Sequence, residues 1–121
     1  TGAWFETVAL MKADNAQSKE ALEHMAKASG TDLAGYQSQL ATTKLFATPA
    51  EALAFATSAG LPDTMQKVAK FSFAHGLLGE GAKSPDAVGM SFANGVALGD
   101  ASNLKLRFDP SYVQMAAEGK L

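Results

Sequence analysis

A glycine-rich stretch in the second half of the chain comes closest to a known chemical motif. Gly76 and Gly81 have the spacing of the two glycines of a phosphate-binding P-loop, in which a lysine directly after the second glycine reaches the outer phosphates. Here Ala82 takes that place and moves Lys83 one position further on. The stretch also follows a predicted helix, whereas a P-loop follows a strand. The pattern therefore indicates a glycine-rich helix end rather than a nucleotide site.

Side chains that could support metal or nucleophilic chemistry are few. There is no cysteine, which excludes disulfides, thiolate nucleophiles and cysteine zinc sites. His24 has acidic neighbours only at Glu20 and Glu23 on its own helix, and His75 lies among apolar residues, where we expect a core histidine bonded to a carbonyl. No serine stands in a Gly-x-Ser-x-Gly elbow. The sequence therefore predicts no catalytic residues, no metal site and no cofactor, and we expect a protein that is not an enzyme.

An aromatic side chain and a carboxylate stand close together at the start of the chain. Trp4, beside Phe5, can be a core anchor. It can also line a ligand site, where a rigid aromatic wall and the nearby carboxylate of Glu6 hold a small polar molecule. The residues alone leave both interpretations open, so Trp4 and Glu6 are candidate ligand-binding residues.

Helical periodicity and start signals predict six helices. Thr48-Pro49-Ala50-Glu51 is the clearest start, a capping box with proline at the first helical position. Thr31 is the predicted cap of the third helix, directly after Gly30 closes the second. The predicted helices cover residues 2–13, 18–29, 31–40, 49–59, 62–78 and 110–118. The expected buried stripe of the fifth consists of Met65, Val68, Ala69, Phe71 or Ser72, and His75.

After Pro85 the hydrophobic period changes to that of strands. Asn94-Gly95 between two short apolar runs is typical of a hairpin around a type I′ turn. Apolar residues at 104, 106 and 108 then alternate with Lys105 and Arg107, so this strand has one apolar and one basic face. Hairpin and strand together cover residues 88–108. The predicted fold class is mainly α with a small β element, in a single segment of residues 1–121.

The composition of the 121 residues is that of a folded chain with a modest core. Hydrophobic residues make up 47% and charged residues 18%, which is too apolar for a disordered chain. The net charge is -2, and the ten Lys and Arg are scattered among twelve acidic residues, so no basic stripe is available for nucleic acid. No apolar run approaches the roughly 20 residues of a membrane-spanning helix, so we expect no membrane insertion.

Short stretches, from the opening Thr1-Gly2-Ala3-Trp4-Phe5-Glu6 to the closing Gly119-Lys120-Leu121, together resemble periplasmic substrate-binding proteins of the nitrate/sulfonate/taurine group of ABC importers. The opening Thr1-Gly2-Ala3-Trp4-Phe5-Glu6 is similar to a helix start, TGAWYE, of that family, with Phe5 where the pattern often has tyrosine. The carboxy-terminal stretch resembles the tail of a subset linked to urea or amide uptake. The stretches that carry the resemblance after the opening are Glu20-Ala21, Met25-Ala26, Val88-Gly89, Asn94-Gly95, Leu98-Gly99-Asp100, Leu106-Arg107-Phe108-Asp109, Tyr112, Ala116-Ala117 and Gly119-Lys120-Leu121.

The resemblance implies a longer, two-lobed α/β protein that holds a small polar solute between its lobes and docks on an ABC permease. This chain would be its carboxy-terminal part, which agrees with an opening at Thr1 directly before a predicted helix. The implied location is periplasmic or otherwise extracytoplasmic in a bacterium, with Trp4 and Glu6 as solute contacts. The rival hypothesis is a self-contained helical interaction or regulatory module.

A piece of a larger protein exposes apolar surface that its remainder would cover, and such surface promotes association. We therefore expect the isolated chain to form a homo-oligomer through Trp4, Phe5 and the strand at 104–108.

Overall fold

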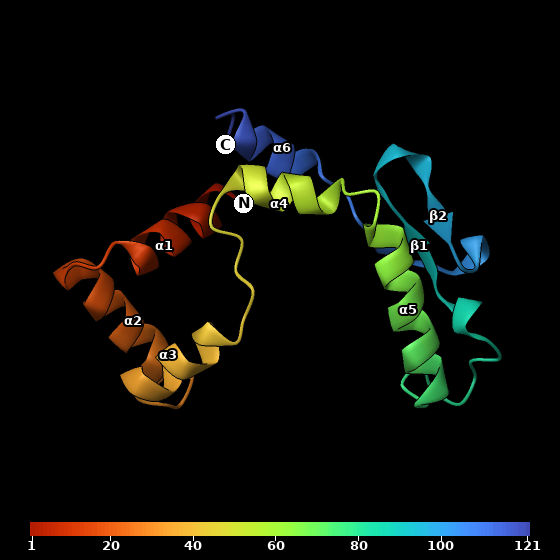
Figure 1. The fold of residues 1–121 in the computed structure, drawn as a ribbon, viewed down its shortest axis with the longest axis horizontal. Coiled ribbons are helices and arrows are strands. Elements are labelled where there is room, and N and C mark those ends of the chain that lie inside the picture. The colour runs from red at the N-terminus through yellow and green to blue at the C-terminus, as the bar shows by residue number, and fades with distance from the viewer.

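A computed structural model shows a mainly helical chain with one small three-stranded sheet. It describes the backbone of residues 1–121 and every side chain except that of Asn94. The chain forms an arch in which a three-helix unit and a sheet-bearing unit stand apart, with α4 and α6 between them at the top (Figure 1). The helices are α1 (Gly2–Lys12), α2 (Ala16–Ala28), α3 (Leu33–Ala41), α4 (Pro49–Ala56), α5 (Leu61–Ala74) and α6 (Ser111–Ala117), and the strands are β1 (Gly89–Ser91), β2 (Ala97–Leu98) and β3 (Leu104–Arg107).

The three-helix unit has a small core of its own. Helix α2 packs against both α1 and α3. Val8 of α1 is 1% exposed, and it shares the interior with Leu22 and Ala26 of α2, which are also buried. Leu22 and Ala26 lie one helical turn apart, on the same face of α2. The unit is thus held by a few apolar contacts between short helices.

The predicted cap of the third helix is wrong by one residue. The carboxylate of Asp32 accepts a hydrogen bond from the Gly35 amide at 2.8 Å, so Asp32 is the N-cap and α3 starts at Leu33. Thr31 instead completes the end of α2, because its amide donates to the Ala26 carbonyl at 3.0 Å across Gly30, which has a positive φ of 73°.

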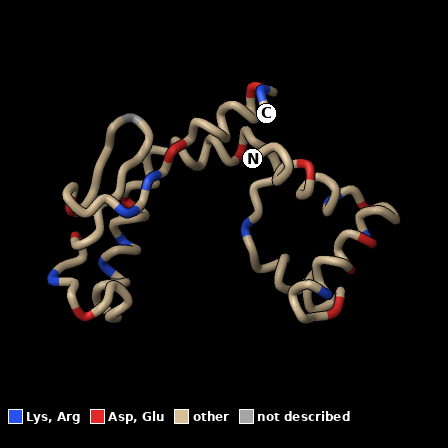
Figure 2. Tube along the Cα trace, turned by 180° about the vertical axis from the view of Figure 1, so that it is seen from behind, with Lys and Arg blue, Asp and Glu red and all other residues tan. Residues whose placement is uncertain are grey.

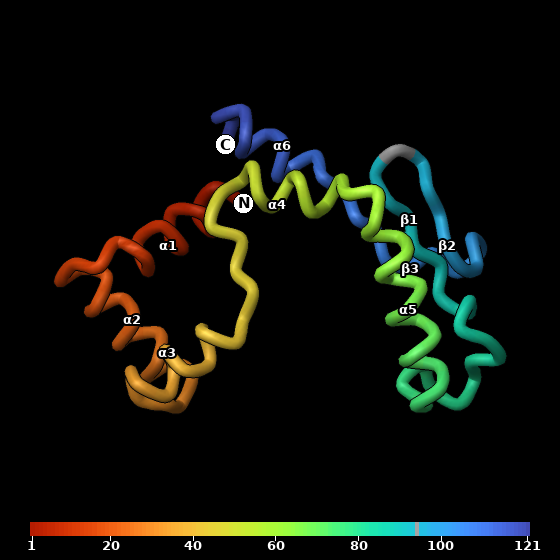
Figure 3. Tube along the Cα trace, in the orientation of Figure 1, coloured from red at the N-terminus to blue at the C-terminus, as the bar shows by residue number. Residues whose placement is uncertain are grey.

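Helices α4 and α6 run antiparallel, side by side, between the two units (Figures 1 and 3). The predicted start is confirmed in part: the Thr48 hydroxyl accepts from the Glu51 amide at 3.2 Å, so Thr48 is the N-cap. The Glu51 carboxylate accepts from the amide of Ala47 at 3.0 Å, one residue before the N-cap, and not from the Thr48 amide that a full capping box would use. The helix ends at Ala56, three residues before the predicted end. The hydroxyl of Thr57 there donates to the Leu53 carbonyl at 2.8 Å and occupies one of the last carbonyls of the helix.

In the sheet-bearing unit, α5 covers one face of a sheet with strand order β2-β1-β3. Strand β1 pairs antiparallel with β2 and parallel with β3, which places Met90 beside both Leu98 and Leu106. Met90 and Phe92 pack with two residues of α5, Leu61 and Ala69, to form the core of this unit. The ring of Phe92 also stacks on that of Phe108, with centroids 4.9 Å apart.

The structure corrects the predicted extent and buried stripe of α5. The helix ends at Ala74 instead of residue 78, because Gly76 takes a left-handed φ of 69° and the chain turns away. Of the predicted stripe, only Ala69 is buried, with Met65 and Ser72 half-buried. The physical reason is that a sheet of three short strands covers only a narrow strip of the helix. The exposed members of the predicted stripe are Val68, Phe71 and His75.

His75 is an exposed helix-end residue and not a core histidine. Its Nδ1 lies 2.9 Å from the Phe71 carbonyl, so the predicted carbonyl partner is confirmed while the predicted burial is wrong. The imidazole also stacks on the exposed ring of Phe71, with centroids 4.0 Å apart. Both partners lie one turn back on the same helix.

The predicted type I′ hairpin turn at Asn94-Gly95 is replaced by a longer connection. Strands β1 and β2 pair only through Met90↔Leu98 and Ser91↔Ala97, and a 3-10 turn, η2 (Ala93–Gly95), joins them. The connection is closed by a hydrogen bond of 2.9 Å from the Phe92 amide to the Val96 carbonyl. The side chain of Asn94 itself lies outside the described part of the chain.

The arch leaves an unusually large surface in contact with solvent. The accessible area is 8138 Å², whereas a compact monomer of 12.5 kDa exposes roughly 6,200 Å². Large apolar side chains lie exposed in all three parts of the arch, and Figure 2 shows acidic and basic residues interspersed along both units. Among the described residues, no helix has both the length and the apolar character needed to cross a membrane. The exposed large apolar residues are Trp4, Phe55, Val68, Phe71, Phe73, Leu77, Val96, Leu106, Tyr112, Met115 and Leu121.

Candidate functional site

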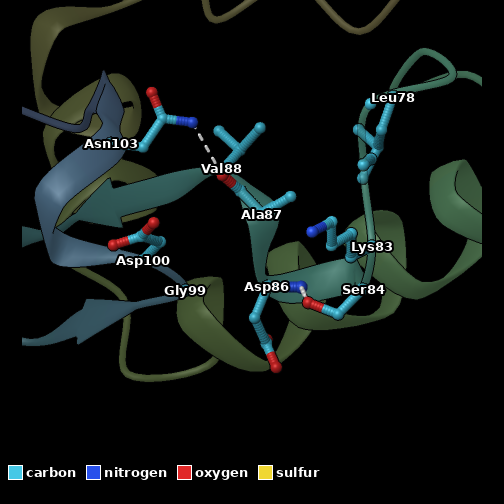
Figure 4. A pocket seen from close by; sticks show the side chains of 11 residues that line it. Leu78, Lys83, Ser84, Asp86, Ala87, Val88, Gly99, Asp100 and Asn103 are labelled. Atoms are coloured by element: carbon cyan, nitrogen blue, oxygen red, sulfur yellow. Dashed lines mark hydrogen bonds between the residues drawn. The ribbon is translucent and has the colours of Figure 1, made fainter.

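A cleft with a volume of about 660 Å³ lies in the sheet-bearing unit. One wall is the glycine-rich segment that follows α5, together with the 3-10 turn η1 (Pro85–Ala87), and the other is the turn η3 (Ala101–Asn103) (Figure 4). The lining residues are Leu78, Gly81, Ala82, Lys83, Ser84, Asp86, Ala87, Val88, Gly99, Asp100 and Asn103.

Local hydrogen bonds fix the two polar side chains on the η3 wall. The Asp100 carboxylate accepts from both the amide and the hydroxyl of Ser102, at 2.8 and 2.6 Å. These bonds to Ser102 lower the pKa of Asp100 from its ordinary value, so the group is a carboxylate at neutral pH. The side-chain nitrogen of Asn103 donates to the Ala87 carbonyl at 2.7 Å, which ties η3 to η1 (Figure 4). The side-chain oxygen of Asn103 is a hydrogen-bond acceptor by type.

Two glycines allow the walls of the cleft to come this close. Gly99 has a φ of 71°, and a Cβ there would collide with the Val88 carbonyl oxygen. A Cβ on Gly89 would collide with the Asp100 carbonyl oxygen in the same way. The close backbone crossing is sealed by a hydrogen bond of 2.8 Å from the Asp100 amide to the Asp86 carbonyl. Only glycine fits at these two positions, because any side chain would push the two backbones apart.

The cleft offers binding groups of both signs. Lys83 lines one side of the cleft, and Asp100 and Asn103 line the other (Figure 4), so a cationic donor, a carboxylate and an amide all belong to its lining. Such a set can hold a small polar molecule that carries both acceptors and donors. The Ser84 hydroxyl accepts from the Asp86 amide at 3.2 Å and caps η1. Within the part of the chain whose side chains are described, no three His, Asp or Glu gather into a metal site.

The two residues that the sequence singled out lie elsewhere. Trp4 and Glu6 are both exposed on the first turns of α1, and Trp4 retains 52% of its surface. Neither lines the 660 Å³ cleft. Positions two apart on a helix point to nearly opposite sides, so the two side chains do not converge on one small molecule within this chain. A site that uses either of them needs further groups brought up against α1.

Sequence reasoning did not bring the residues of the cleft together. Gly81, Ala82 and Lys83 entered only as part of a rejected P-loop, and the cleft residues Val88, Gly99 and Asp100 entered only in stretches that carry the family resemblance. Asp100-Ala101-Ser102 has the Asp-x-Ser form in which an aspartate bonds the amide two residues on, so the turn at η3 was detectable. The approach of η3 to η1 was not detectable, because it depends on the parallel pairing of β1 with β3.

Comparisons with protein-family models, with curated proteins and with solved structures found no match for this chain. The resemblance to solute-binding proteins therefore depends on the residues quoted for it in the sequence.

Proposed function

We propose that this chain is the carboxy-terminal part of a solute-capture protein of an ABC importer, and that it acts by non-covalent binding of a small polar solute. In this proposal the protein is bacterial and periplasmic or otherwise extracytoplasmic, and its closed, loaded form docks on a permease. Closure of lobes around a solute is a general mechanism of such proteins.

The observation that carries the proposal is the division of the chain into two separately packed units with α4 and α6 between them. This division supports the proposal, because two lobes joined by crossing segments would divide a chain in the same way. The accessible surface exceeds that of a compact chain by roughly 2,000 Å², which fits units whose open faces are covered by further protein. A self-contained module of this size would instead be expected to close around one core.

A solute screen tests the proposal directly. The polypeptide encoded by the complete gene is expected to gain thermal stability with one solute from a set of nitrate, taurine, urea, short amides and pyrimidines. A ligand that binds only the folded form contributes about 2.7 kcal/mol at 100 times its Kd, which raises Tm by several degrees. The isolated 121-residue chain is expected to show no shift, because it lacks the opposing groups of the pocket. Equal binding by the isolated chain would favour the self-contained module instead.

Trp4 and Glu6 stay the proposed solute contacts on α1, the first as a flat apolar wall and the second as an acceptor for amine or amide donors. In the full-length protein, Trp4→Ala is expected to weaken solute binding at least tenfold, measured by isothermal titration. Its Tm should change little, because Trp4 is half-exposed in this unit and surface substitutions usually alter stability by about 0.5 kcal/mol or less. A lowered Tm with unchanged affinity would show that Trp4 is a packing residue.

A further inference from the structure

A groove lies in the three-helix unit, between its helices and the segment that leaves α3 toward α4. Its volume is about 470 Å³, within the range of about 300–1,000 Å³ that is usual for small-molecule sites. Figure 3 shows the segment running from the end of α3 up to α4. All three helices and this segment contribute lining residues, so the groove is formed only when α1, α2 and α3 are packed together.

Apolar side chains from separate elements line this groove. Val8 of α1 and Leu22 of α2, both buried, form its inner surface. Met11 of α1, Leu40 of α3 and Leu45 of the segment after α3 are half-buried and extend the apolar lining outward. A hydrocarbon chain placed there would lose its contact with water along most of its length. Each methylene group buried in this way tightens binding about fourfold.

The charged side chains of the groove have one sign. Lys12 and Lys44 both line it and are exposed, and no Asp or Glu belongs to its lining among the described side chains. Neither lysine takes part in the ion pairs that the described residues form. The Nζ atom of Lys44 lies 5.7 Å from the ring centroid of Phe46, a contact that is weak at an exposed site and can give way to an anion. The acidic residues of this unit all lie outside the lining: Glu6, Asp14, Glu20, Glu23 and Asp32.

Two helix ends beside the groove oppose an anion only in part. Helices α1 and α3 both end there, and each helix carboxyl end carries roughly half a negative charge. Hydrogen bonds already occupy carbonyls at both ends: the Met11 carbonyl accepts from the Ser18 hydroxyl at 3.3 Å, and the Leu40 carbonyl accepts from the Thr43 amide at 3.0 Å. The two full positive charges of the lysines therefore outweigh the partial charges of the helix ends, and the groove favours an anion.

We propose that this groove binds an aliphatic carboxylate of medium chain length, with decanoate as the representative ligand. The hydrocarbon chain lies along the apolar lining, and the carboxylate pairs with the lysines. An apolar anion matches both features of the groove, whereas a small polar solute lacks the apolar part and an aliphatic cation has the wrong charge. Trp4 and Glu6 do not line the groove, so the inference is independent of the solute-capture proposal.

A panel of three amphiphiles tests the inference on the unmodified chain. Decanoate, hexanoate and decyltrimethylammonium are each titrated by isothermal calorimetry, below the concentrations at which they form micelles. For decanoate we expect a Kd on the order of 100 µM or tighter. Hexanoate should bind at least tenfold more weakly, because it has four fewer methylene groups to bury. The cation should also bind at least tenfold more weakly. Equal binding of either control compound would overturn the proposal.

Charge removal and site mapping provide the second arm. Lys12→Gln/Lys44→Gln should weaken decanoate binding about fivefold, since two exposed ion pairs are lost. The matched control is Lys19→Gln/Lys27→Gln, which removes the same charge from exposed residues of α2 outside the groove and should bind as before. Equal weakening in both variants would mean that decanoate reports net charge alone.

In amide NMR spectra, decanoate should shift the signals of Met11, Leu40 and Leu45 and leave those of β1 unchanged. Shifts of equal size in both units would show general adsorption to exposed apolar surface, and the groove would be abandoned as a site.

Discussion

Gly99→Ala is expected to unfold the sheet-bearing unit. The residue has a φ of 71°, and an added Cβ would collide with the Val88 carbonyl oxygen, a backbone atom that cannot rotate away. The left-handed φ alone costs about 1 kcal/mol for alanine, and the collision adds to it, so we expect a loss of about 3 kcal/mol or more. The loss should appear as rapid hydrogen exchange at the β1 amides, measured by NMR.

Two further glycine variants separate the cost of the left-handed φ from the cost of the Cβ collision. Gly76→Ala has the same left-handed φ but open space around the added Cβ, so it should cost only about 1 kcal/mol. Gly89→Ala has an ordinary φ but collides with the Asp100 carbonyl oxygen, so it should be nearly as damaging as Gly99→Ala. If Gly99→Ala proved no worse than Gly76→Ala, the close crossing of η3 over the start of β1 would be refuted.

The three-helix unit and the sheet-bearing unit are expected to unfold separately. Val8→Asp puts a carboxylate in a site with 1% exposure, at a cost of about 4 kcal/mol or more. A unit of roughly 45 residues holds only about 2–7 kcal/mol of stability, so α1, α2 and α3 should lose their protection against exchange together. Ala69→Asp in α5 should do the same to the sheet-bearing unit and leave α2 protected.

The matched controls are Ala9→Asp and Gln66→Asp, which introduce the same side chain at exposed positions of the same two helices. Both should leave exchange in their units nearly unchanged, because a surface substitution seldom alters stability by more than about 0.5 kcal/mol. If Val8→Asp and Ala69→Asp each removed exchange protection from the entire chain, the chain would have one cooperative core, and the description of two units would fail.

The features predicted correctly from the sequence are those determined within one turn of helix or one strand. The cap at Thr48 needs only residues three apart, and its hydroxyl accepts from the Glu51 amide as predicted, while the Glu51 carboxylate accepts from the amide of Ala47 just before it. The position of the strand at residues 104–107 needs only the period of a strand and is confirmed, whereas its predicted apolar and basic faces are interrupted by a register irregularity at Lys105, between the pairs Gly89↔Leu104 and Met90↔Leu106. The mainly helical class with a small β element follows from the same local signals and is confirmed.

The features that sequence reasoning missed depend on contacts between distant residues. Val68 and Phe71 look like core positions because they continue an apolar stripe, yet the sheet is too narrow to cover them. Lys83 and Asn103 come to one cleft through the pairing of β1 with β3 and the bond from Asn103 to Ala87. No period or spacing in the sequence predicts that Lys83 and Asn103 line the same cleft. The role assigned to Trp4 and Glu6 depends on a family resemblance, and it stays a prediction.

The pairing of α4 with α6 has a consequence for the order in which the chain folds. Roughly fifty residues separate the two helices, and closing a flexible loop of that length costs about 3.5 kcal/mol in chain entropy beyond a constant term. The intervening residues form the sheet-bearing unit, which follows α4 at one end and leads into α6 at the other (Figure 1). Once that unit has formed, its ends are already neighbours and most of the loop entropy has been lost. The top of the arch should therefore assemble after the sheet, and folding should slow when the sheet is weakened even though α4 and α6 are unchanged.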